Sequence, residues 1–140
     1  MGAEALANLA RIGQLKAQAP DMAEFQRMLT QARTRCADAQ LLHVSVDGRF
    51  ASIYGAAHAA ALAALRWHGY RSENRFTVFQ CLAHTLEWPA HRWRVLDAAH
   101  QKRNLAEYEG FLDIEDSMVN EMVQLVKELI IDVEQLAKQK

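Results

Sequence analysis

Hydrophobic residues recur at helical spacing along almost the whole chain, and strict alternation of apolar and polar residues is rare. The clearest amphipathic segment covers about 115–137, where apolar side chains lie three or four positions apart. This spacing predicts a long helix that buries one face in the core. Its apolar stripe consists of Val119, Met122, Val123, Val126, Leu129, Ile130, Val133 and Leu136.

Other segments repeat the helical pattern, and their ends carry recognisable signals. They cover about 21–40, 49–68, 74–86 and 90–108. Gly69 and Gly110 are placed to end two of these helices, since glycine readily takes the left-handed backbone of a helix C-terminus. Pro89 ends another, because the residue before a proline disfavours helical backbone. The connection over 41–48 has Asp47-Gly48 as its turn signal.

The alanine-rich helix over about 49–68 is expected to lie against a close neighbour, because alanines allow two helix axes to approach. Its inner stripe consists of Phe50, Ile53, Tyr54, Ala57, Ala61, Leu62, Ala64 and Leu65. A shorter, peripheral helix is expected over about 5–15. The sequence therefore predicts an all-α fold, an antiparallel bundle of four to five core helices with a short extra N-terminal helix. We expect one domain over 1–140.

Composition agrees with one ordered domain. The chain has 140 residues, 51% of them hydrophobic, and only two prolines and six glycines. No start typical of a signal peptide and no apolar run long enough to span a membrane is visible, so we expect a cytoplasmic protein without a membrane partner. Cys36 and Cys81 are far apart and form no Cys-x-x-Cys pair, which favours two buried thiols over a disulfide or zinc site.

Charge is divided unevenly along the chain. The segment 49–103 has eight basic residues against three acidic ones, and the segment 104–140 has nine acidic residues against three lysines. The resulting charges, near +5 and −6, are compatible with a phosphate-bearing ligand at the basic segment. They are equally compatible with the two segments packing against each other.

Candidate chemistry is concentrated on the helix expected over 90–108. At 100° per residue, its polar side chains fall within an arc of roughly 140°. They are Asp97, His100, Arg103, Asn104, Glu107 and Tyr108, and the opposite side, expected to pack, consists of Val95, Ala98, Ala99, Leu105 and Ala106. One interpretation is an interhelical polar network in which Arg103 bonds Glu107 one turn away. The other is a phosphate site, in which Arg103 grips a phosphodiester, Asn104 orients a hydroxyl and His100 transfers a proton.

Other histidines and the tryptophans are interpreted as structural residues. His58 lies at the margin of an apolar stripe and is interpreted as a buried, hydrogen-bonded histidine. His84 and His91 have no metal-ligand spacing, so neither a metal nor a cofactor is expected. Tryptophans at 67, 88 and 93 are interpreted as core or interface aromatics.

The segment Val95-Leu-Asp-Ala-Ala-His-Gln-Lys-Arg-Asn-Leu-Ala-Glu-Tyr108 resembles the HEPN domains, a family of small helical bundles. The resemblance spans roughly 25–136, with weaker support from the alanine-rich helix and the Gly69-Tyr70-Arg71 that follows it. It implies a homodimer with its site in a cleft between protomers. Some HEPN domains are paired with nucleotidyltransferases in toxin–antitoxin or defence modules, which implies such an antitoxin as a partner.

Ribonuclease members of this family have an arginine followed, after four to six residues, by a histidine, and they are taken to cleave RNA without metal. Here Arg103 and Asn104 match, but Tyr108 stands after a four-residue gap. Gly110 stands where nucleotidyltransferase-controlled toxins have a tyrosine that is modified. The pair Arg94 and His100 has a permitted spacing but precedes the Arg-Asn pair.

Two functional hypotheses follow from the resemblance and its departures. The first is a HEPN-like domain that binds RNA or a nucleotide in a polar cleft at a homodimer interface, within a toxin–antitoxin or defence module. The second is a metal-independent ribonuclease toxin with a variant Arg-x4-Tyr motif. Both assign the chemistry to Arg103, Asn104 and Tyr108 and ligand contacts to the remaining polar stripe, which consists of His100, Glu107 and Asp97.

Overall fold

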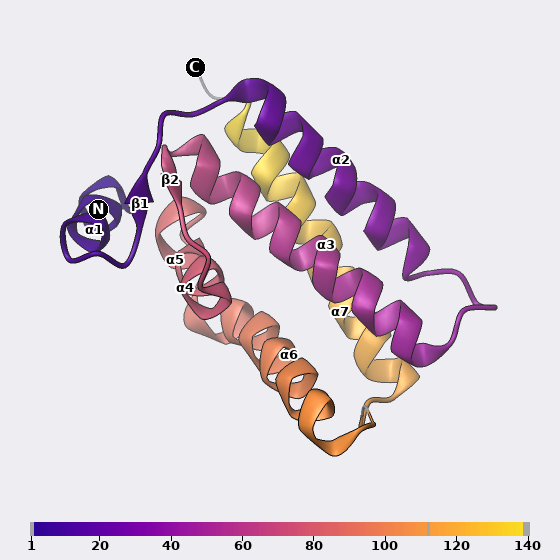
Figure 1. Cartoon of the computed structure of the whole chain (residues 1–140). Helices are drawn as coiled ribbons and strands as arrows, with labels where there is room; N and C mark the ends of the chain where they lie inside the picture. The colour runs from indigo at the N-terminus through magenta and orange to yellow at the C-terminus, as the bar shows by residue number, and fades with distance from the viewer. Residues whose placement is uncertain (1, 112, 139–140) are drawn as a thin grey trace.

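The computed structural model describes residues 2–111 and 113–138, and it is an all-α bundle with one small two-stranded ribbon at its edge (Figure 1). The order of elements is α1 (Gly2–Arg11), β1 (Lys16–Ala17), α2 (Met22–Asp38), α3 (Val46–Trp67), β2 (Tyr70–Arg71), α4 (Arg75–Gln80), α5 (Leu82–Thr85), α6 (Ala90–Glu109) and α7 (Asp116–Leu136). The predicted fold class is confirmed.

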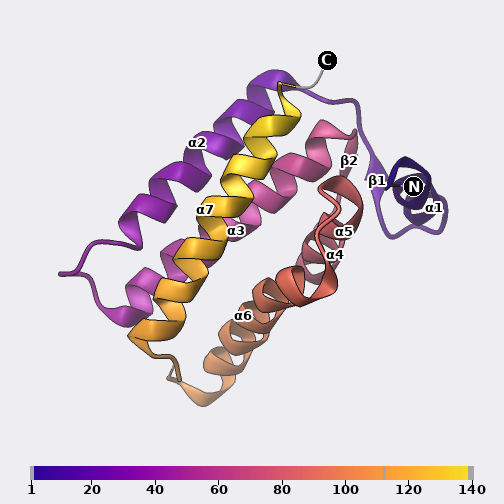
Figure 2. The same ribbon diagram turned by 180° about the vertical axis from the view of Figure 1, so that it is seen from behind.

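The core is built around α3, which lies between α2 and α7 on one side and α4 to α6 on the other (Figure 1). Seen from behind, α7 runs along both α2 and α3 (Figure 2). Consecutive long helices run in opposite directions, whereas α3 and α7 run in the same direction (Figure 1). The alanines of α3 are buried, as the close helix approach requires, and they include Ala56, Ala57, Ala60, Ala61, Ala63 and Ala64. The predicted stripe of α7 is buried throughout.

The start of α3 differs from the expected turn at Asp47-Gly48. Helical backbone begins at Val46, and the side chain of Ser45 accepts a hydrogen bond of 3.1 Å from the Gly48 amide. A serine at this position satisfies one of the free amides of the first helical turn. The turn expectation was therefore wrong: these residues form the first turn of α3, and the connection ends before them.

One helix expected over 74–86 is two short helices. Asn74 caps α4 by accepting from the Thr77 amide at 3.0 Å. At Cys81 the helix has a 3₁₀-type hydrogen bond, because the His84 amide donates to the carbonyl of Cys81, three residues earlier, at 2.8 Å. The chain therefore changes from α4 to α5 at Cys81, which is buried. Cys36 is also buried, and both thiols are free.

The N-terminal segment contains an element that hydrophobic periodicity did not indicate. Helix α1 ends at Arg11 rather than near 15, and Gly13 turns the chain with a φ of +83°. The following strand β1 pairs with β2 in antiparallel register, with Lys16 opposite Arg71. Two-residue strands are too short to show alternation, so no periodic signal marks them.

The basic middle segment and the acidic tail pack together through individual ion pairs. Arg49, buried at the start of α3, donates to Asp116 at 3.1 Å and to the Asn120 side chain at 2.8 Å. Arg92 of α6 pairs with Glu128 of α7. Within residues 2–111 and 113–138, no helix is long and apolar enough to cross a membrane.

Candidate anion-binding site

The face of α6 that points toward α3 is apolar in the first half of the helix and polar in the second half. Its buried residues, Trp93, Leu96 and Ala99, all lie in the first half. Along the same face, His100 and Arg103 follow, because residues three or four apart lie one above the other on a helix. The inner face is therefore apolar in the first half and polar in the second.

This arrangement corrects the expected packing side of α6. Val95 and Leu105 were expected inside but are 43% and 54% exposed, and only Ala99 of that predicted set is buried. The expectation treated all polar residues as outward-facing. Because the second half of α6 borders a cavity instead of the core, its polar side chains face inward without being excluded from solvent.

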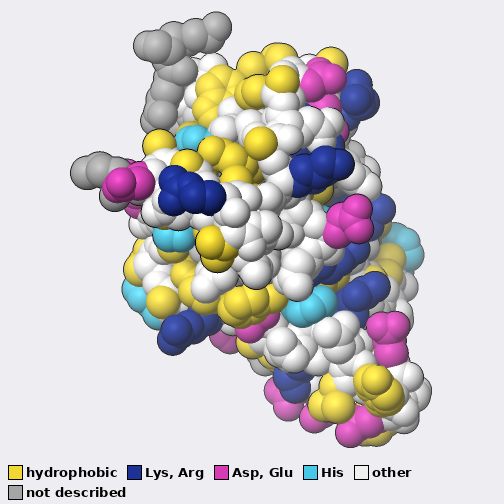
Figure 3. Space-filling view, turned by 60° about the vertical axis from the view of Figure 1, so that its left-hand side comes forward, with side chains coloured by type: hydrophobic (Ala, Val, Ile, Leu, Met, Phe, Trp, Pro, Cys, Tyr) yellow, Lys and Arg dark blue, Asp and Glu magenta, His cyan; other side chains and the backbone are white. Residues whose placement is uncertain are grey.

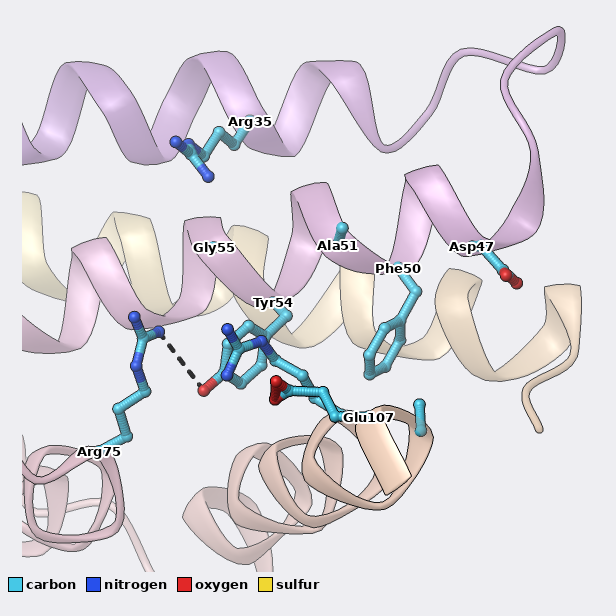
Figure 4. Close-up of a pocket in the computed structure, with 10 residues that line it drawn as sticks. Arg35, Asp47, Phe50, Ala51, Tyr54, Gly55, Arg75 and Glu107 are labelled. Carbon is cyan, nitrogen blue, oxygen red and sulfur yellow. Dashed lines mark hydrogen bonds between the residues drawn. The ribbon is translucent and has the colours of Figure 1, made fainter. Parts of the chain in front are cut away.

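The cavity has a volume of about 460 Å³ and lies between α2, α3, α4 and α6 (Figure 4). Helix α3 forms its floor, and each of the other helices contributes an arginine. Its lining consists of Arg35, Asp47, Phe50, Ala51, Tyr54, Gly55, Arg75, Arg103, Ala106 and Glu107. We call it the arginine pocket.

Two of the three pocket arginines lie beside the ring of Tyr54. The guanidinium carbons of Arg75 and Arg103 lie 5.5 and 5.3 Å from the ring centroid, within the range of cation–π attraction. Arg75 also donates a long hydrogen bond of 3.4 Å to the Tyr54 hydroxyl, drawn as a dashed line in Figure 4. Among the described residues, the ion pairs within 4.0 Å involve Arg33, Arg49, Arg66, Arg71 and Arg92, but none of the three pocket arginines.

Arg35 reaches the pocket across a gap in the surface of α3. A Cβ atom added at Gly55 would lie 2.6 Å from Arg35 Nη1 and 3.1 Å from its Cδ, closer than such atoms approach. Glycine at this position therefore gives the arginine its path from α2 (Figure 4).

Two carboxylates line the pocket but do not neutralise it. Glu107 follows Arg103 by one turn, yet the two form no ion pair among the described contacts. The expected Arg103–Glu107 bond of the polar-network interpretation is therefore absent. Asp47 lies toward the start of α3, away from Tyr54 and the arginines around it (Figure 4).

His100 stands next to the pocket and joins α6 to α3. Its Nδ1 lies 2.8 Å from the Tyr54 hydroxyl, and its Nε2 lies 3.2 Å from the Asn104 amide nitrogen. With that amide nitrogen donating to Nε2, the neutral ring holds its proton on Nδ1 and donates it to Tyr54. Burial lowers the pKa of His100, Asp97 opposes this, and Arg75 and Arg103 lower it further. The ring is therefore held in its neutral form.

His58 of α3 lies near the pocket arginines. It is half-buried, with its ring edge-on to Phe79 at 6.2 Å. Burial first, and then the charges of Arg75, His100 and Arg103, lower its pKa to about 4. The hydrogen bond that we expected for it is absent among the described residues, so the buried, hydrogen-bonded interpretation holds only in part.

The remaining residues of the predicted stripe lie elsewhere. Tyr108 is 92% exposed and does not line the arginine pocket. Asp97 lines a separate groove beside Trp93. Arg94 stacks near Trp93 in that groove, whereas His100 contacts Tyr54, so these two do not form one site. The structure thus brings Arg103, Glu107, His100 and Asn104 together and leaves Tyr108 and Asp97 apart.

Sequence reasoning missed Arg35, Arg75 and the role of Tyr54, which it assigned only to the apolar stripe. No spacing rule links arginines on three helices that are far apart in the chain. One signal was available in Gly55, because a glycine inside an alanine-rich helix often marks the close approach of another group.

Comparison with protein-family models, curated proteins and solved structures finds no match to this chain. Among residues 2–111 and 113–138, no three His, Cys, Asp or Glu side chains are grouped to hold a metal ion. The pocket offers guanidinium donors, a phenol and the carboxylates of Asp47 and Glu107, and the neutral imidazole of His100 lies next to it. Guanidinium groups bind phosphate and carboxylate oxygens through paired, charge-assisted hydrogen bonds.

Proposed function

We propose that the arginine pocket binds a phosphate group of RNA or of a nucleotide, as in the HEPN-like domains that the α6 sequence resembles. The observation that carries this proposal is the convergence of Arg35, Arg75 and Arg103 without a carboxylate within ion-pairing distance. Guanidinium groups that line one cavity without a paired carboxylate repel one another, and a bound anion relieves that repulsion.

The pocket is also a chemically sensible place for a nucleotide. An arginine binds two phosphate oxygens at once, and several arginines can surround one phosphate or follow a strand from one phosphate to the next. The Tyr54 hydroxyl accepts from His100 and Arg75 in the arrangement above, which leaves its own proton free to donate to a ligand oxygen. Glu107 can accept from a ribose hydroxyl at the rim.

We further propose that the protein forms a homodimer through the outer end of α6. Trp93 and Leu96 of α6 are buried in their own chain, so they are not free for this contact. The support comes instead from Leu105, Tyr108 and Phe111, large apolar side chains that are exposed next to the pocket. In Figure 3, hydrophobic and acidic side chains gather at the lower end of the molecule, where α6 ends in Figure 1.

Light scattering tests the dimer. A second copy covering this surface gives a particle of about twice 15.8 kDa, and Leu105→Glu should return it to the monomer mass. The matched control is Ile131→Glu, which changes an exposed apolar side chain of α7. A monomer at high micromolar concentration in the native protein would contradict the proposal.

Metal-independent ribonuclease activity is the second candidate function, and the pairing of His100 with Arg103 beside one cavity supports it. In such a reaction the ribose 2′-hydroxyl attacks the adjacent phosphorus and its proton passes to the imidazole. The bond from phosphorus to the 5′-oxygen breaks, which leaves a 2′,3′-cyclic phosphate, and the 5′-oxygen takes a proton from water. Tyr108, which is exposed outside the pocket, would not serve this step within one chain. Digestion of single-stranded RNA in excess chelator should then survive Tyr108→Phe and fail in His100→Gln.

RNA binding at several salt concentrations tests the main proposal. The probe is a labelled single-stranded hexaribonucleotide, and the variants are Arg35→Met, Arg75→Met and Arg103→Met. Each should weaken binding by about 1–3 kcal/mol, the value of a hydrogen bond to a charged group. Each substitution that removes a phosphate-binding arginine should also reduce the slope of log K against log salt by about 0.7.

Arg33→Met is the matched control for these variants. Arg33 lies two positions from Arg35 on α2, but it is turned to the outside, where it pairs with Glu134 at 2.7 Å. This substitution removes the same charge and should leave RNA affinity nearly unchanged. Equal losses of affinity in all four variants would show that RNA responds only to net charge and not to the pocket.

A further inference from the structure

A second hollow lies on the other side of α6, between it and α4. It has a volume of about 540 Å³ and is lined by aromatic, amide and charged side chains. Phe76 of α4 is 41% exposed, and its ring meets the ring of Trp93 edge-on, with centroids 6.2 Å apart. The guanidinium carbon of Arg94 lies 5.4 Å from the Trp93 ring. We call this hollow the Phe76 groove.

Asp97 provides a polar group in the groove that the fold does not use. Its Oδ1 atom is shielded from solvent and has no hydrogen-bond partner among the described residues. A ligand in the groove therefore meets Oδ2, the Asp97 carboxylate oxygen that is not shielded. Arg94, three positions away, forms no ion pair with it within the described part of the chain.

Aromatic faces and hydrogen-bonding groups in one groove match a nucleobase. Base rings stack on aromatic side chains and on guanidinium planes, and their edges carry donors and acceptors. An ionised carboxylate only accepts hydrogen bonds, so Asp97 would select bases with an exocyclic amino group. Gln80 and Gln101, which also line the groove, can both donate and accept.

The groove and the arginine pocket lie on either side of one contact between α4 and α6. Arg75 lines the pocket, and the next residue, Phe76, lines the groove. On α6, His100 falls between the arc that faces the pocket and the arc that faces the groove, and Asn104 falls between Trp93 and Asp97 within the groove arc, because each residue advances by 100°. A strand whose phosphate enters the pocket could therefore turn a base toward the groove across these two residues.

We propose that the Phe76 groove is a nucleobase subsite that takes a base with an exocyclic amino group, which makes the ligand a single-stranded RNA segment with its phosphate in the arginine pocket. This inference rests on the phosphate-binding function proposed above. Phe76 supplies the stacking face, Asp97 accepts from the amino group and the pocket arginines hold the backbone.

Three labelled hexamers test the proposal by equilibrium binding: oligoadenylate, oligouridylate and an abasic ribose-phosphate chain. Native protein should bind oligoadenylate about tenfold tighter than the abasic chain, the lower range of base stacking on an aromatic side chain. Phe76→Ala should abolish this preference, whereas Phe76→Tyr should retain it. Asp97→Asn should remove the preference of adenine over uracil, because an amide offers a donor as well as an acceptor.

Phe76→Leu and Arg103→Met separate the base subsite from folding and from phosphate binding. Phe76→Leu keeps an apolar side chain over Trp93 but has no ring to stack, so it should lose the base preference with an unchanged thermal midpoint. Arg103→Met should weaken all hexamers by the same factor. If native protein binds oligoadenylate and the abasic chain equally and Arg103→Met weakens both, the groove is not a base subsite and phosphate binding stands.

If no hexamer binds, the proposed function fails and the groove is tested alone with adenosine. The readout is the indole N–H resonance of Trp93, which should shift on adding adenosine to native protein and stay unchanged in Phe76→Ala. Absence of any shift in native protein overturns the base subsite. A shift that persists in Phe76→Ala overturns it as well.

Discussion

Arg66 lies on α3 near its C-terminal end, and Arg103 lies on α6 beside Tyr54 of α3; their guanidinium groups have opposite surroundings. Arg66 is 1% exposed and donates to Glu24 at 2.6 Å and to the carbonyls of Gln18 and Ala19 at 2.9 and 2.8 Å. Arg103 is exposed to the cavity and has neither a carboxylate within 4.0 Å nor a hydrogen-bond acceptor among the described residues.

The difference separates two uses of the same residue type. Arg66 connects the end of α3 to the start of α2, and Arg71 of β2 pairs with the other oxygen of Glu24. The two arginines lower the pKa of that carboxyl, with the Arg66 hydrogen bond the largest cause and burial opposing it. An arginine whose donors are all used stabilises the fold, and one whose donors remain free can bind a ligand.

The largest expected effect comes from removing the satisfied arginine. Arg66→Met should lower the free energy of unfolding by about 3–5 kcal/mol, because it leaves one oxygen of the Glu24 carboxylate and two carbonyls without their donor, although Arg71 still pairs with the other oxygen. Urea denaturation followed by circular dichroism measures this. Arg103→Met should change the same quantity by less than about 0.5 kcal/mol, as for a surface substitution. Equal losses of stability in the two variants would end the distinction between them.

The free energy of unfolding should also fall in acid, because of His58 near the arginine pocket. His58 has a pKa of about 4 in the folded protein against 6.5 as its ordinary value, so the unfolded chain binds the proton more readily. The stability from neutral His58 is complete above pH 6.5 and is lost as the pH falls toward 4, by about 3 kcal/mol in all. Unfolding free energies at several pH values should show this slope in native protein.

His58→Gln supplies the control, because glutamine is polar but does not titrate in this range. It should remove the component of the slope between pH 6.5 and 4 while the carboxylates continue to titrate below it. A slope of the same size in this variant would assign the acid sensitivity to other groups.

Inorganic phosphate should distinguish the two arginine environments without any RNA. A ligand that binds only the folded state raises its stability, by about 2.7 kcal/mol at a concentration roughly one hundred times its Kd. Native protein and Arg33→Met should both gain thermal stability from phosphate at constant ionic strength, whereas Arg103→Met should gain much less. Chloride at the same ionic strength is the control for general screening.

The helical architecture could be predicted from sequence, because helix periodicity is a local property that survives without knowledge of partners. The stripe of α7, the stop at Gly110 and the buried alanines of α3 all follow from it. The site could be predicted only on α6. Arg35 and Arg75 join it through tertiary packing, which leaves no periodic mark in the sequence.

The orientation of α6 was predicted wrongly for a related physical reason. A helical wheel assumes that one face is apolar along the whole helix, but α6 passes from the core to the edge of a cavity along its length. Leu96 and Arg103 consequently share one face, whereas the wheel placed Arg103 on the polar stripe and Leu105 on the opposite, packing side. A polar residue on the continuation of a buried face is the pattern that identifies such a cavity.

Gly55→Ala should have the smallest effect on the free energy of unfolding, and it tests directly whether Arg35 belongs to the ligand site. An alanine inside a helix is favoured over glycine by about 1 kcal/mol, so the variant should gain up to that amount in unfolding free energy. Its Cβ would meet Arg35 Nη1 at 2.6 Å and Cδ at 3.1 Å, so the Arg35 side chain must shift from its present position beside the pocket. The same substitution should therefore weaken phosphate and RNA binding, measured by titration calorimetry. A protein that is more stable but binds less shows that α3 retains glycine for ligand binding, and unchanged affinity would remove Arg35 from the site.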